Sequence, residues 1–296
     1  MNNKIKFKKY QCGGNDFVLF DLREGENESI GKLLDFPDRI QGITHRQFGI
    51  GADGILVLDN PKNPFHHVRL QYFNADGSLA SLCGNGLMCT VLECGMIPKD
   101  SVTYVECDNG IYKSFLLDGH VTIEFACVED LGREIPREIL DCHAIFQEMF
   151  FVNTGVEHLC VELKNKEELD SLDVAYWGNF LCQHAFFFPK KTNVNFFTVE
   201  SDKIWIRTFE RGVYAETLSC GTGIMATSIF ACVKQRNKDA NLCEFTGNVF
   251  SKGGEYQSVI HWDQSSKQPH SLRLKGTPKF VFQGDFIPTI PKSFSN

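Results

Sequence analysis

Two cysteines stand in the same short motif at two positions in the chain. Cys83 begins the segment CGNGLMCTVL, and Cys220 begins the segment CGTGIMATSI. The shared pattern, C-G-x-G-[LI]-M-x-T-x-[LI], recurs after 137 residues, which is close to half of the 296-residue chain. A repeat of this length indicates that the chain consists of two copies of one structural unit.

Apolar residues follow each motif at helical spacing. They are Leu87, Met88, Val91 and Leu92 after the first cysteine, and Ile224, Met225 and Ile229, with Ser228, after the second. This spacing predicts a helix with one apolar face, and each cysteine lies at or just before the helix N-terminus. The glycines leave the first backbone N–H groups uncovered.

A helix N-terminus binds anions and lowers the pKa of a cysteine located there. Two such sites could bind an α-carboxylate and stabilise the charge that forms when an α-proton leaves. A racemase without a cofactor needs a thiolate on one face of the carbon and a thiol on the other. A single C-G-x-G is more often a turn before a core helix, but its repetition favours Cys83 and Cys220 as an acid/base pair.

Composition excludes several other classes of protein. The net charge of −7 argues against a nucleic-acid partner, and no apolar run approaches the roughly 18 residues of a membrane span. No apolar segment follows the basic N-terminus, so we expect a cytoplasmic protein with a small-molecule partner. The 12 cysteines include no C-x-x-C pair, so a zinc site of the usual spacing is not supported, and most are expected to be buried thiols.

Most of the chain has the pattern of short strands. Strands are predicted at 4–11, 17–22, 55–59, 67–74, 102–107, 111–117, 120–128, 150–155, 157–163, 194–201 and 203–210. A glycine-rich turn at 12–15 separates the first two. The charged segment 131–139, which contains a proline, is predicted to connect the two halves.

With these motifs the sequence resembles bacterial diaminopimelate epimerase over nearly its whole length. The resemblance rests on GGNDFVLFD (13–21), RQFGIGADG (46–54), FNADGSLASLCGNGLMC (73–89), TNVNFF (192–197), FERG (209–212), ETLSCGTG (216–223) and LKGTPKFVFQGDF (274–286). These polar motifs occur in the order, and near the spacing, expected for the family.

The resemblance implies an α+β fold of two pseudo-symmetric domains, each a curled, mainly antiparallel sheet around a central helix. The implied domains are residues 1–130, with a returning strand at 279–296, and residues 131–278. The implied reaction converts LL-diaminopimelate to the meso form, in lysine and peptidoglycan precursor synthesis. No cofactor and no metal are expected, and a homodimer is expected.

The resemblance also implies roles for individual residues. Cys83 and Cys220 match the two catalytic cysteines, and His158 and Glu210 match groups that set their protonation. Substrate contacts are implied for Asn15, Asn74, Gly84, Asn85, Asn193, Glu210, Arg211, Gly221 and Thr222. An asparagine both donates and accepts, as a zwitterionic substrate requires, and an arginine fork suits a carboxylate.

Three departures from the family pattern matter, and the first concerns the distal end of the substrate. Val156 stands where the family has an asparagine, and Gly54 stands where some members have a glutamine. One extra residue lies in Val213-Tyr214-Ala215, which is expected to alter the position of Arg211 relative to Cys220. A lost hydrogen bond to a charged group costs about 1.5–3 kcal/mol, so we expect relaxed selectivity that includes glutamate.

Other functions remain open at this point. A proline or hydroxyproline racemase also has paired cysteines before Gly-x-Gly turns, although the FNADG and ERG segments argue against it. A cysteine hydrolase would use one cysteine as nucleophile and His158 as base. A non-catalytic amino-acid-binding protein would keep the amide and arginine contacts but would not need the thiols.

Overall fold

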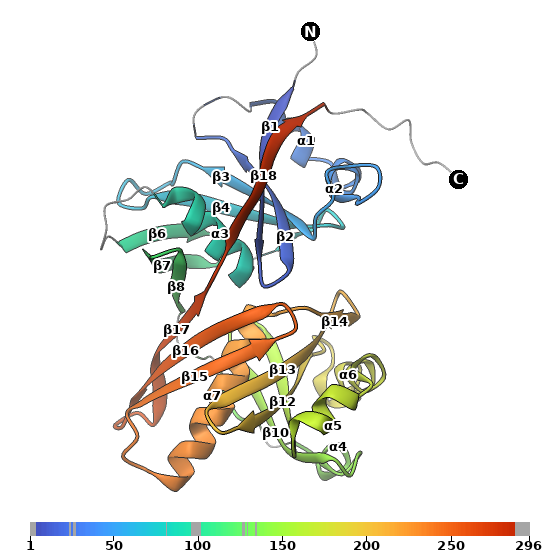
Figure 1. The fold of residues 1–296 in the computed structure, drawn as a ribbon, viewed down its shortest axis with the longest axis vertical. Helices are drawn as coiled ribbons and strands as arrows, with labels where there is room; N and C mark the ends of the chain where they lie inside the picture. The colour runs from blue at the N-terminus through green and yellow to red at the C-terminus, as the bar shows by residue number, and fades with distance from the viewer. Residues whose placement is uncertain are drawn as a thin grey trace. The chain divides into compact units, whose positions relative to one another are not determined.

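The computed structural model describes residues 4–23, 25, 28–80, 82–95, 102–125, 128, 130–133 and 135–287 (Figure 1). The chain divides into two units, one of residues 1–123 with 277–296 and the other of residues 124–276. The predicted domain boundaries, 130/131 and 278/279, differ from these by a few residues. No helix among the described residues is long and apolar enough to cross a membrane.

In the first unit, a mixed sheet is formed by strands in the order β18-β1-β2-β3-β4-β6-β7. The β2–β3 and β4–β6 pairs are parallel, the other pairs are antiparallel, and short β5 pairs with β4. The elements are β1 (Ile5–Cys12), β2 (Asn15–Asp21), α1 (Glu28–Leu34), α2 (Pro37–Thr44), β3 (Gly54–Asp59), β4 (Val68–Asn74), β5 (Leu79–Ala80), α3 (Gly84–Cys94), β6 (Val102–Cys107), β7 (Gly110–Leu117) and β18 (Lys279–Phe286), with β8 (His120–Phe125) at the boundary.

The second unit has a sheet in the order β9-β10-β11-β12-β13-β15-β16-β17. Here β11–β12 and β13–β15 are parallel, and short β14 pairs with β13. The elements are β9 (Asp130–Leu131), α4 (Arg137–Leu140), β10 (Phe146–Asn153), β11 (Glu157–Leu163), α5 (Lys166–Ser171), α6 (Val174–Cys182), the 3-10 helix η1 (Ala185–Phe187), β12 (Asn193–Glu200), β13 (Lys203–Glu210), β14 (Ala215–Thr217), α7 (Gly221–Lys238), β15 (Glu244–Ser251), β16 (Gly254–Asp263) and β17 (Gln268–Gly276).

The two units repeat one another strand by strand. The pairing β1-β2-β3-β4-β6-β7 matches β10-β11-β12-β13-β15-β16, with parallel pairs at the same two points. In each unit a short hairpin strand, β5 or β14, precedes a helix that begins at the cysteine motif. The predicted α+β fold of two similar units is confirmed.

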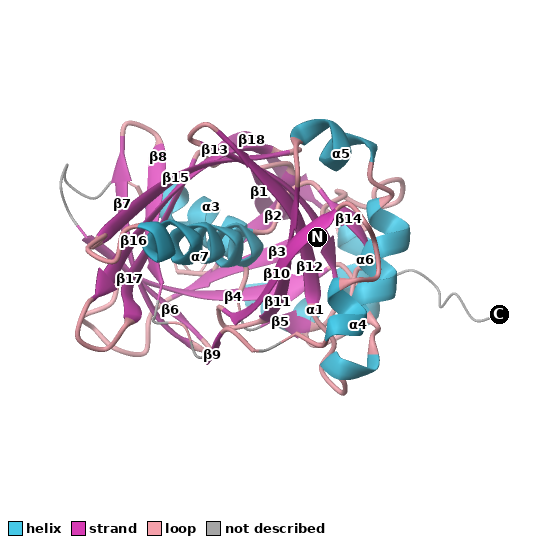
Figure 2. Cartoon of the chain, turned by 90° about the horizontal axis from the view of Figure 1, so that it is seen from below, coloured by secondary structure: helices cyan, strands magenta, loops and turns pink. Residues whose placement is uncertain are grey.

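The sheet of the second unit curls around α7, which packs against β10 to β13 and β15 to β17 (Figure 2). Of the residues from Gly221 to Cys232, all but Thr222 are buried. The prediction of a single apolar face was therefore wrong for this helix. Strands surround the helix, and its buried residues include small ones such as Ala226 and Thr227 as well as Met225.

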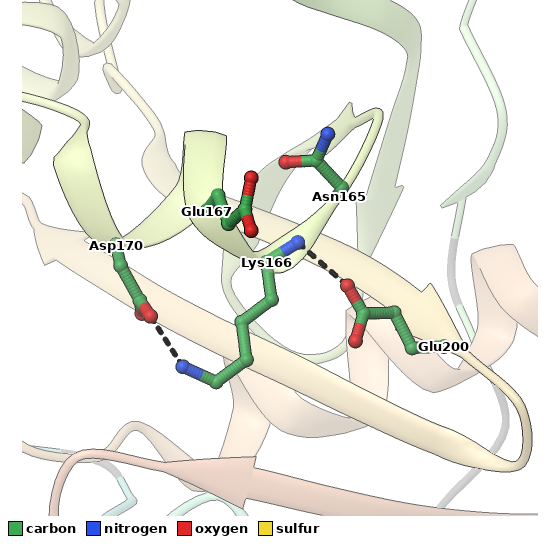
Figure 3. Close-up of a pocket in the computed structure, with 5 residues that line it drawn as sticks. All are labelled: Asn165, Lys166, Glu167, Asp170 and Glu200. Atoms are coloured by element: carbon green, nitrogen blue, oxygen red, sulfur yellow. Dashed lines mark hydrogen bonds and ion pairs between the residues drawn. The ribbon is translucent and has the colours of Figure 1, made fainter.

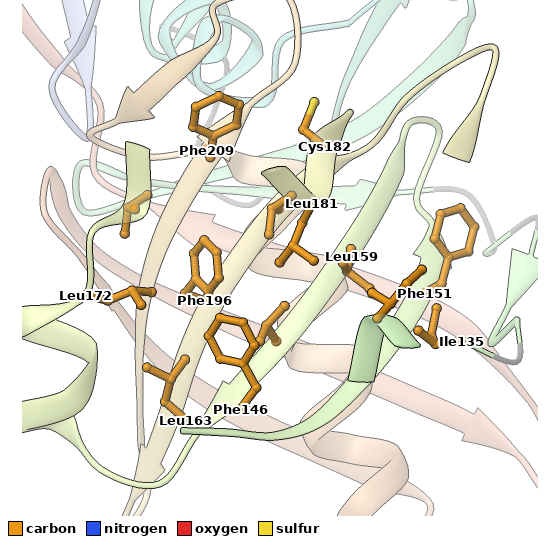
Figure 4. Close-up of a cluster of buried hydrophobic side chains, with 14 of the residues drawn as sticks. Ile135, Phe146, Phe151, Leu159, Leu163, Leu172, Leu181, Cys182, Phe196 and Phe209 are labelled. Atoms are coloured by element: carbon orange, nitrogen blue, oxygen red, sulfur yellow. The ribbon is translucent and has the colours of Figure 1, made fainter. Parts of the chain in front are cut away.

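Alternation along the strands separates two layers of side chains. On β11, His158 and Cys160 contact residues of α7, whereas Leu159, Val161 and Leu163 point to the other face. There they join an apolar cluster with residues of α4, α5 and α6 (Figure 4). This alternation explains why polar side chains are buried next to the start of α7.

The predicted connector at 131–139 is not an exposed linker. Residues of β9 pair with β10, and Ile135 and Ile139 are 7% and 1% exposed within the apolar cluster. The charged residues and the proline suggested a loop, but the two isoleucines bury this segment in the second unit.

Candidate active site

Both cysteines are N-cap residues of the helices that the motifs predict. Cys83 precedes α3 with φ −136° and ψ 111°, and Cys220 precedes α7 with φ −130° and ψ 110°. Each backbone carbonyl accepts the first helical hydrogen bond, from Leu87 at 2.8 Å and from Ile224 at 2.9 Å. The predicted position of each cysteine at a helix N-terminus is confirmed.

The second glycine of each motif fills a position where a side chain would collide. A Cβ at Gly223 would lie 2.3 Å from Asn195 Oδ1, and a Cβ at Gly86 would lie 2.8 Å from Leu56 Cδ2. The close approach of strand residues to the first helical turn therefore favours glycine at both positions, most strongly at Gly223. In both units the helix start is held tightly against the sheet.

Cys83 is half-buried and has two neighbours that set its hydrogen bonding. Its sulfur lies 3.6 Å from Asn15 Oδ1, to which the thiol donates, and 3.4 Å from the backbone nitrogen of Gly86, from which it accepts. The amide nitrogen of Asn15 donates to Asp53 Oδ2 at 2.9 Å. This bond orients the side-chain amide of Asn15 so that its Oδ1 faces the thiol.

A charged network holds Asn15 and Asp53 in place. Arg46 donates to Asp53 at 2.6 Å and to Asp16 at 2.9 Å, and Lys9 lies 2.7 Å from Asp16. Burial opposes ionisation of Asp16, but the hydrogen bonds from Arg46 and Lys9 outweigh it and lower its pKa. Asp53, held by Arg46, thus positions the asparagine that contacts Cys83.

Cys220 is 9% exposed, and its sulfur lies 3.4 Å from Thr222 Oγ1. The same hydroxyl lies 3.0 Å from His158 Nε2, and His158 Nδ1 lies 3.0 Å from the amide nitrogen of Asn195. His158 is fully buried, and burial lowers its pKa to about 3, with a further contribution from the positive charge of Arg211. His158 is therefore a neutral imidazole that is linked to Cys220 through Thr222.

Several other cysteines are buried where ionisation is unfavourable. Burial raises the pKa of Cys107 and Cys160 to about 12 and that of Cys94 and Cys232 to about 11. The expectation that most cysteines are buried thiols agrees with these positions; Cys243 is exposed.

Arg211 is positioned by Glu157 and by backbone groups. Its Nη1 lies 2.8 Å from Glu157 Oε2 and donates to the carbonyl oxygens of Lys190 and Lys191. Asn193 accepts from the Arg211 backbone nitrogen at 2.9 Å. Glu157, which stands next to Val156 and is 8% exposed, therefore anchors the arginine that the sequence predicts to bind substrate.

Glu210 is at the end of β13, where its Oε1 accepts from Thr217 at 2.6 Å. The extra residue that follows it is accommodated in the β13–β14 turn. Tyr214 takes a positive φ of 54°, its backbone nitrogen donates to the Glu210 carbonyl at 2.8 Å, and its hydroxyl accepts from Lys191 at 2.9 Å.

Asn74 and Gly54 lie opposite one another in the β3–β4 pair. The amide nitrogen of Asn74 donates to Ser78 Oγ at 2.9 Å within a turn. A Cβ at Gly54 would lie 2.5 Å from the Tyr72 ring and 2.6 Å from the Phe73 carbonyl oxygen. These contacts leave no room for a glutamine at position 54.

The structure therefore brings the predicted residues into two sets, one in each unit. The first contains Cys83 and Asn15 with the start of α3. The second links Cys220, Thr222 and His158, and joins Asn193 to Arg211.

Several residues at these sites were missed by the sequence reasoning. They include Asp53, with its partners Arg46 and Asp16, and also Asn195 and Glu157. Asn195 lies two residues after Asn193, on the same face of β12, which is the one signal that could have indicated it.

A hollow on the surface of the second unit contains none of these residues. It is lined by Asn165, Lys166, Glu167, Asp170 and Glu200, where Lys166 pairs with Asp170 and its backbone nitrogen donates to Glu200 (Figure 3). Within the described ranges, no group of three or more histidine, cysteine or acidic side chains is arranged to hold a metal ion.

Comparison with known proteins gives solved structures of similar fold. A phenazine biosynthesis protein of the PhzF family from Bacillus anthracis has a TM-score of 0.71 at 14% identity, covering 96% of this chain and 99% of that one. A probable proline racemase from Agrobacterium radiobacter has a TM-score of 0.63 at 15% identity, covering 97% and 94%. At these identities the likeness concerns the fold alone.

Sequence relatives are closer. A diaminopimelate epimerase from Aquifex aeolicus is 32% identical over 286 residues, covering 95% of this chain and 97% of the relative. One from Hydrogenobaculum sp. is 36% identical over 285 residues, covering 93% and 96%. The family described as diaminopimelate epimerase matches residues 7–118 and 150–279. The chain belongs to the diaminopimelate epimerase family.

Proposed function

We propose that the protein interconverts LL- and meso-2,6-diaminopimelate by proton transfer through Cys83 and Cys220. One observation carries the proposal: each of two similar units begins its central helix with an N-cap cysteine followed by Gly-x-Gly. Membership of an epimerase family makes the protein an isomerase that acts on an amino acid.

The proposed reaction has two proton transfers at one carbon. The thiolate of one cysteine removes the α-proton, so the C–H bond breaks and an S–H bond forms. The thiol of the other cysteine gives its proton to the opposite face and becomes a thiolate. The product has inverted configuration, and the two cysteines have exchanged protonation states. The reverse reaction uses the same steps.

Backbone N–H groups at the two helix starts are proposed to bind the substrate near the reacting carbon. Gly84, Asn85, Gly221 and Thr222 supply these groups, which favour the extra negative charge that develops as the proton leaves. Asn15, Asn74, Asn193, Glu210 and Arg211 are proposed to contact the remaining polar groups of the substrate. None of these steps calls for a cofactor or a metal.

The wider setting follows from the same proposal. A diaminopimelate epimerase would act in lysine and peptidoglycan precursor synthesis, in the cytoplasm and as a homodimer. Its two halves, 1–130 with 279–296 and 131–278, would each supply one cysteine.

Selectivity for the distal end of the substrate is proposed to be relaxed. Val156 offers no hydrogen bond there, and its neighbour Glu157 brings a carboxylate to Arg211 at 2.8 Å. A shorter amino acid with a distal carboxylate, such as glutamate, would then also be racemised. Asparagine at position 156 should restore preference for diaminopimelate, and an unchanged substrate ratio in Val156→Asn would contradict this.

The hydrolase alternative is disfavoured by the surroundings of His158. A general base must reach the thiol that it activates. The imidazole is fully buried, contacts Thr222 rather than a sulfur, and has a pKa of about 3. It is therefore a poor base for a cysteine nucleophile.

The test is a stereochemical assay of purified, reduced protein with LL-diaminopimelate and, separately, with L-glutamate. We expect inversion of diaminopimelate and slower inversion of glutamate, both absent in Cys83→Ala and Cys220→Ala. Inversion that survives in either variant would overturn the two-cysteine reaction. No inversion by the unmodified protein would overturn the proposed function.

A further inference from the structure

Four side chains of the second unit form one continuous hydrogen-bond chain that ends at Cys220. Thr208 Oγ1 donates to Asn195 Oδ1 at 3.0 Å, and Asn195 Nδ2 lies 3.0 Å from His158 Nδ1. His158 Nε2 lies 3.0 Å from Thr222 Oγ1, which lies 3.4 Å from Cys220 Sγ. Thr208, Asn195 and His158 are at most 3% exposed.

The chemistry of these groups gives the chain one direction. The amide nitrogen of Asn195 carries only donors, so His158 Nδ1 must accept and carries no proton. A neutral imidazole then has its proton on Nε2 and donates it to the Thr222 oxygen. The hydroxyl proton of Thr222 is left to point at the sulfur of Cys220.

The orientation of the Asn195 amide sets this order. Its Oδ1 accepts from Thr208, and its Nδ2 also lies 3.8 Å from the sulfur of Cys160. A flipped amide would donate to Thr208 Oγ1 and accept from a protonated His158 Nδ1, which would reverse the direction of the chain. The tautomer of His158 therefore tells the two orientations apart.

The cysteine of the first unit is held differently. The thiol of Cys83 donates to Asn15 Oδ1, because Asp53 occupies the amide nitrogen of Asn15. An acceptor next to sulfur favours the thiol, whereas a donor next to sulfur favours the thiolate. Cys83 also accepts from Gly86, so its contacts do not all favour one form.

We propose that Thr208, Asn195, His158 and Thr222 are positioning residues that stabilise the thiolate of Cys220 by directing the Thr222 hydroxyl proton at its sulfur. Cys220 is then the resting base of the proposed reaction, and Cys83, which donates to Asn15, is the resting acid. The inference rests on the proposed function for its meaning, but its test does not depend on turnover.

Titratable and charged groups on the strands that pack against α7 include Glu157, Cys160 and Glu162 on β11, Arg207 and Glu210 on β13, and Tyr256 on β16. His158, with a pKa of about 3, and Cys160, with a pKa of about 12, keep one protonation state between pH 6 and 10. Glu216 is ion-paired to Arg207 and Lys252, Glu210 accepts from Thr217, and the Tyr256 hydroxyl contacts Ser219.

The experiment measures how the rate of iodoacetamide alkylation depends on pH at Cys220 and Cys83, each followed by mass spectrometry of its own peptide. In Thr222→Val we expect the midpoint of the pH dependence at Cys220 to rise by about one pH unit. Below the midpoint, this rise corresponds to a roughly tenfold smaller fraction of thiolate. Thr222→Ser should restore it. The midpoint at Cys83 should not change in either variant.

Thr227→Val is the matched control, because it removes another buried hydroxyl from α7, one that faces Cys160 at 3.7 Å. It should leave the Cys220 midpoint unchanged. An unchanged midpoint in Thr222→Val, or an equal rise in Thr227→Val, would overturn the proposal. If the unmodified protein catalyses no epimerisation, while the Cys220 midpoint still rises in Thr222→Val as expected, the result would count against the proposed function instead.

A second measurement uses the unmodified protein. Nitrogen NMR of 15N-histidine-labelled protein at pH 7, assigned by the signal missing from His158→Gln, reports which ring nitrogen carries the proton. The proposal predicts the Nε2–H tautomer at His158. An Nδ1–H tautomer would reverse the direction of the chain and overturn it.

Discussion

His158 illustrates how burial decides the role of a single side chain. The family resemblance implied that His158 sets the protonation of a cysteine. In the structure its side chain is fully buried between Asn195 and Thr222. With a pKa of about 3, the imidazole does not take up a second proton near neutral pH. Its influence on Cys220 passes through a hydroxyl.

The buried imidazole should make the protein less stable in acid. His158 is neutral when folded, but in the unfolded chain it binds a proton below pH 6.5, so the unfolded state holds more protons between pH 6.5 and 3. The free energy of unfolding should therefore fall as pH falls through this window, by about 2 kcal/mol from this group between pH 7 and 5.

Urea unfolding of His158→Gln at both pH values tests this. The variant should lose about 2 kcal/mol less than the unmodified protein on going from pH 7 to pH 5. The same pH dependence in both proteins would contradict the neutral buried state of His158.

Glu157 should matter for substrate binding through Arg211. Glu157→Gln keeps the shape but removes the charge that anchors the arginine at 2.8 Å. We expect KM for diaminopimelate to rise about tenfold, for a loss of roughly 1.4 kcal/mol, with little change in kcat. Lys190→Gln removes the exposed partner of the same carboxylate and serves as the control. An unchanged KM in Glu157→Gln would show that substrate binding by Arg211 does not depend on Glu157.

At the scale of elements, the motif glycines link sequence to packing. Gly223 and Gly86 lie in the first turns of α7 and α3, where strand and turn side chains approach closely. The side-chain oxygen of Asn195, held by Thr208, faces Gly223, whereas a flexible leucine methyl faces Gly86. The two positions should therefore differ in tolerance.

Gly223→Ala should lower the free energy of unfolding by about 2–3 kcal/mol, because Asn195 Oδ1 cannot move without breaking its bond to Thr208. Gly86→Ala should cost about 1 kcal/mol or less, since Leu56 can change rotamer. Gly42→Ala, at an open position in α2, should gain up to about 1 kcal/mol. Urea unfolding gives all three values, and a Gly223→Ala protein as stable as Gly42→Ala would contradict the packing.

Elements with strong local patterns could be predicted from the sequence. The strands before residue 210 alternate clearly, and the two motif helices begin at glycines after a cysteine. Helices α5 and α6 and strands β15 to β17 were not predicted, because their short or mixed patterns gain stability from contacts made only after folding. The burial of Ile135 and Ile139 in the predicted connector at 131–139 was missed for the same reason, since it depends on α4 packing against β10.

Site residues divide in the same way. Cys83, Cys220 and Asn15 occur in recognisable motifs and could be named. The bond from Thr222 to His158, the support of Asn195 and the pairing of Glu157 with Arg211 depend on which strand faces lie together. A sequence gives residue types at these positions but not the direction of their hydrogen bonds.

For the whole molecule, the repeated topology is the basis of the proposed chemistry. Both units have the same strand pairing and the same central helix with a cysteine N-cap. They differ in the groups around the sulfur, an acceptor amide for Cys83 and a threonine hydroxyl, proposed to donate, for Cys220. A pair of acid/base groups with similar positions and different protonation suits a reaction that removes a proton at one face and returns one at the other.

The most direct test of this account is the fate of the α-hydrogen in D₂O at early conversion of LL-diaminopimelate. A thiol that equilibrates with solvent delivers deuterium to the product, while the abstracted proton stays on the other sulfur and can return only to substrate. Nuclear magnetic resonance should therefore show a meso product deuterated at the inverted carbon and unreacted substrate that keeps its protium. A product that retains protium at the inverted carbon would show that one group both removes and returns the proton, and would contradict the two-cysteine mechanism.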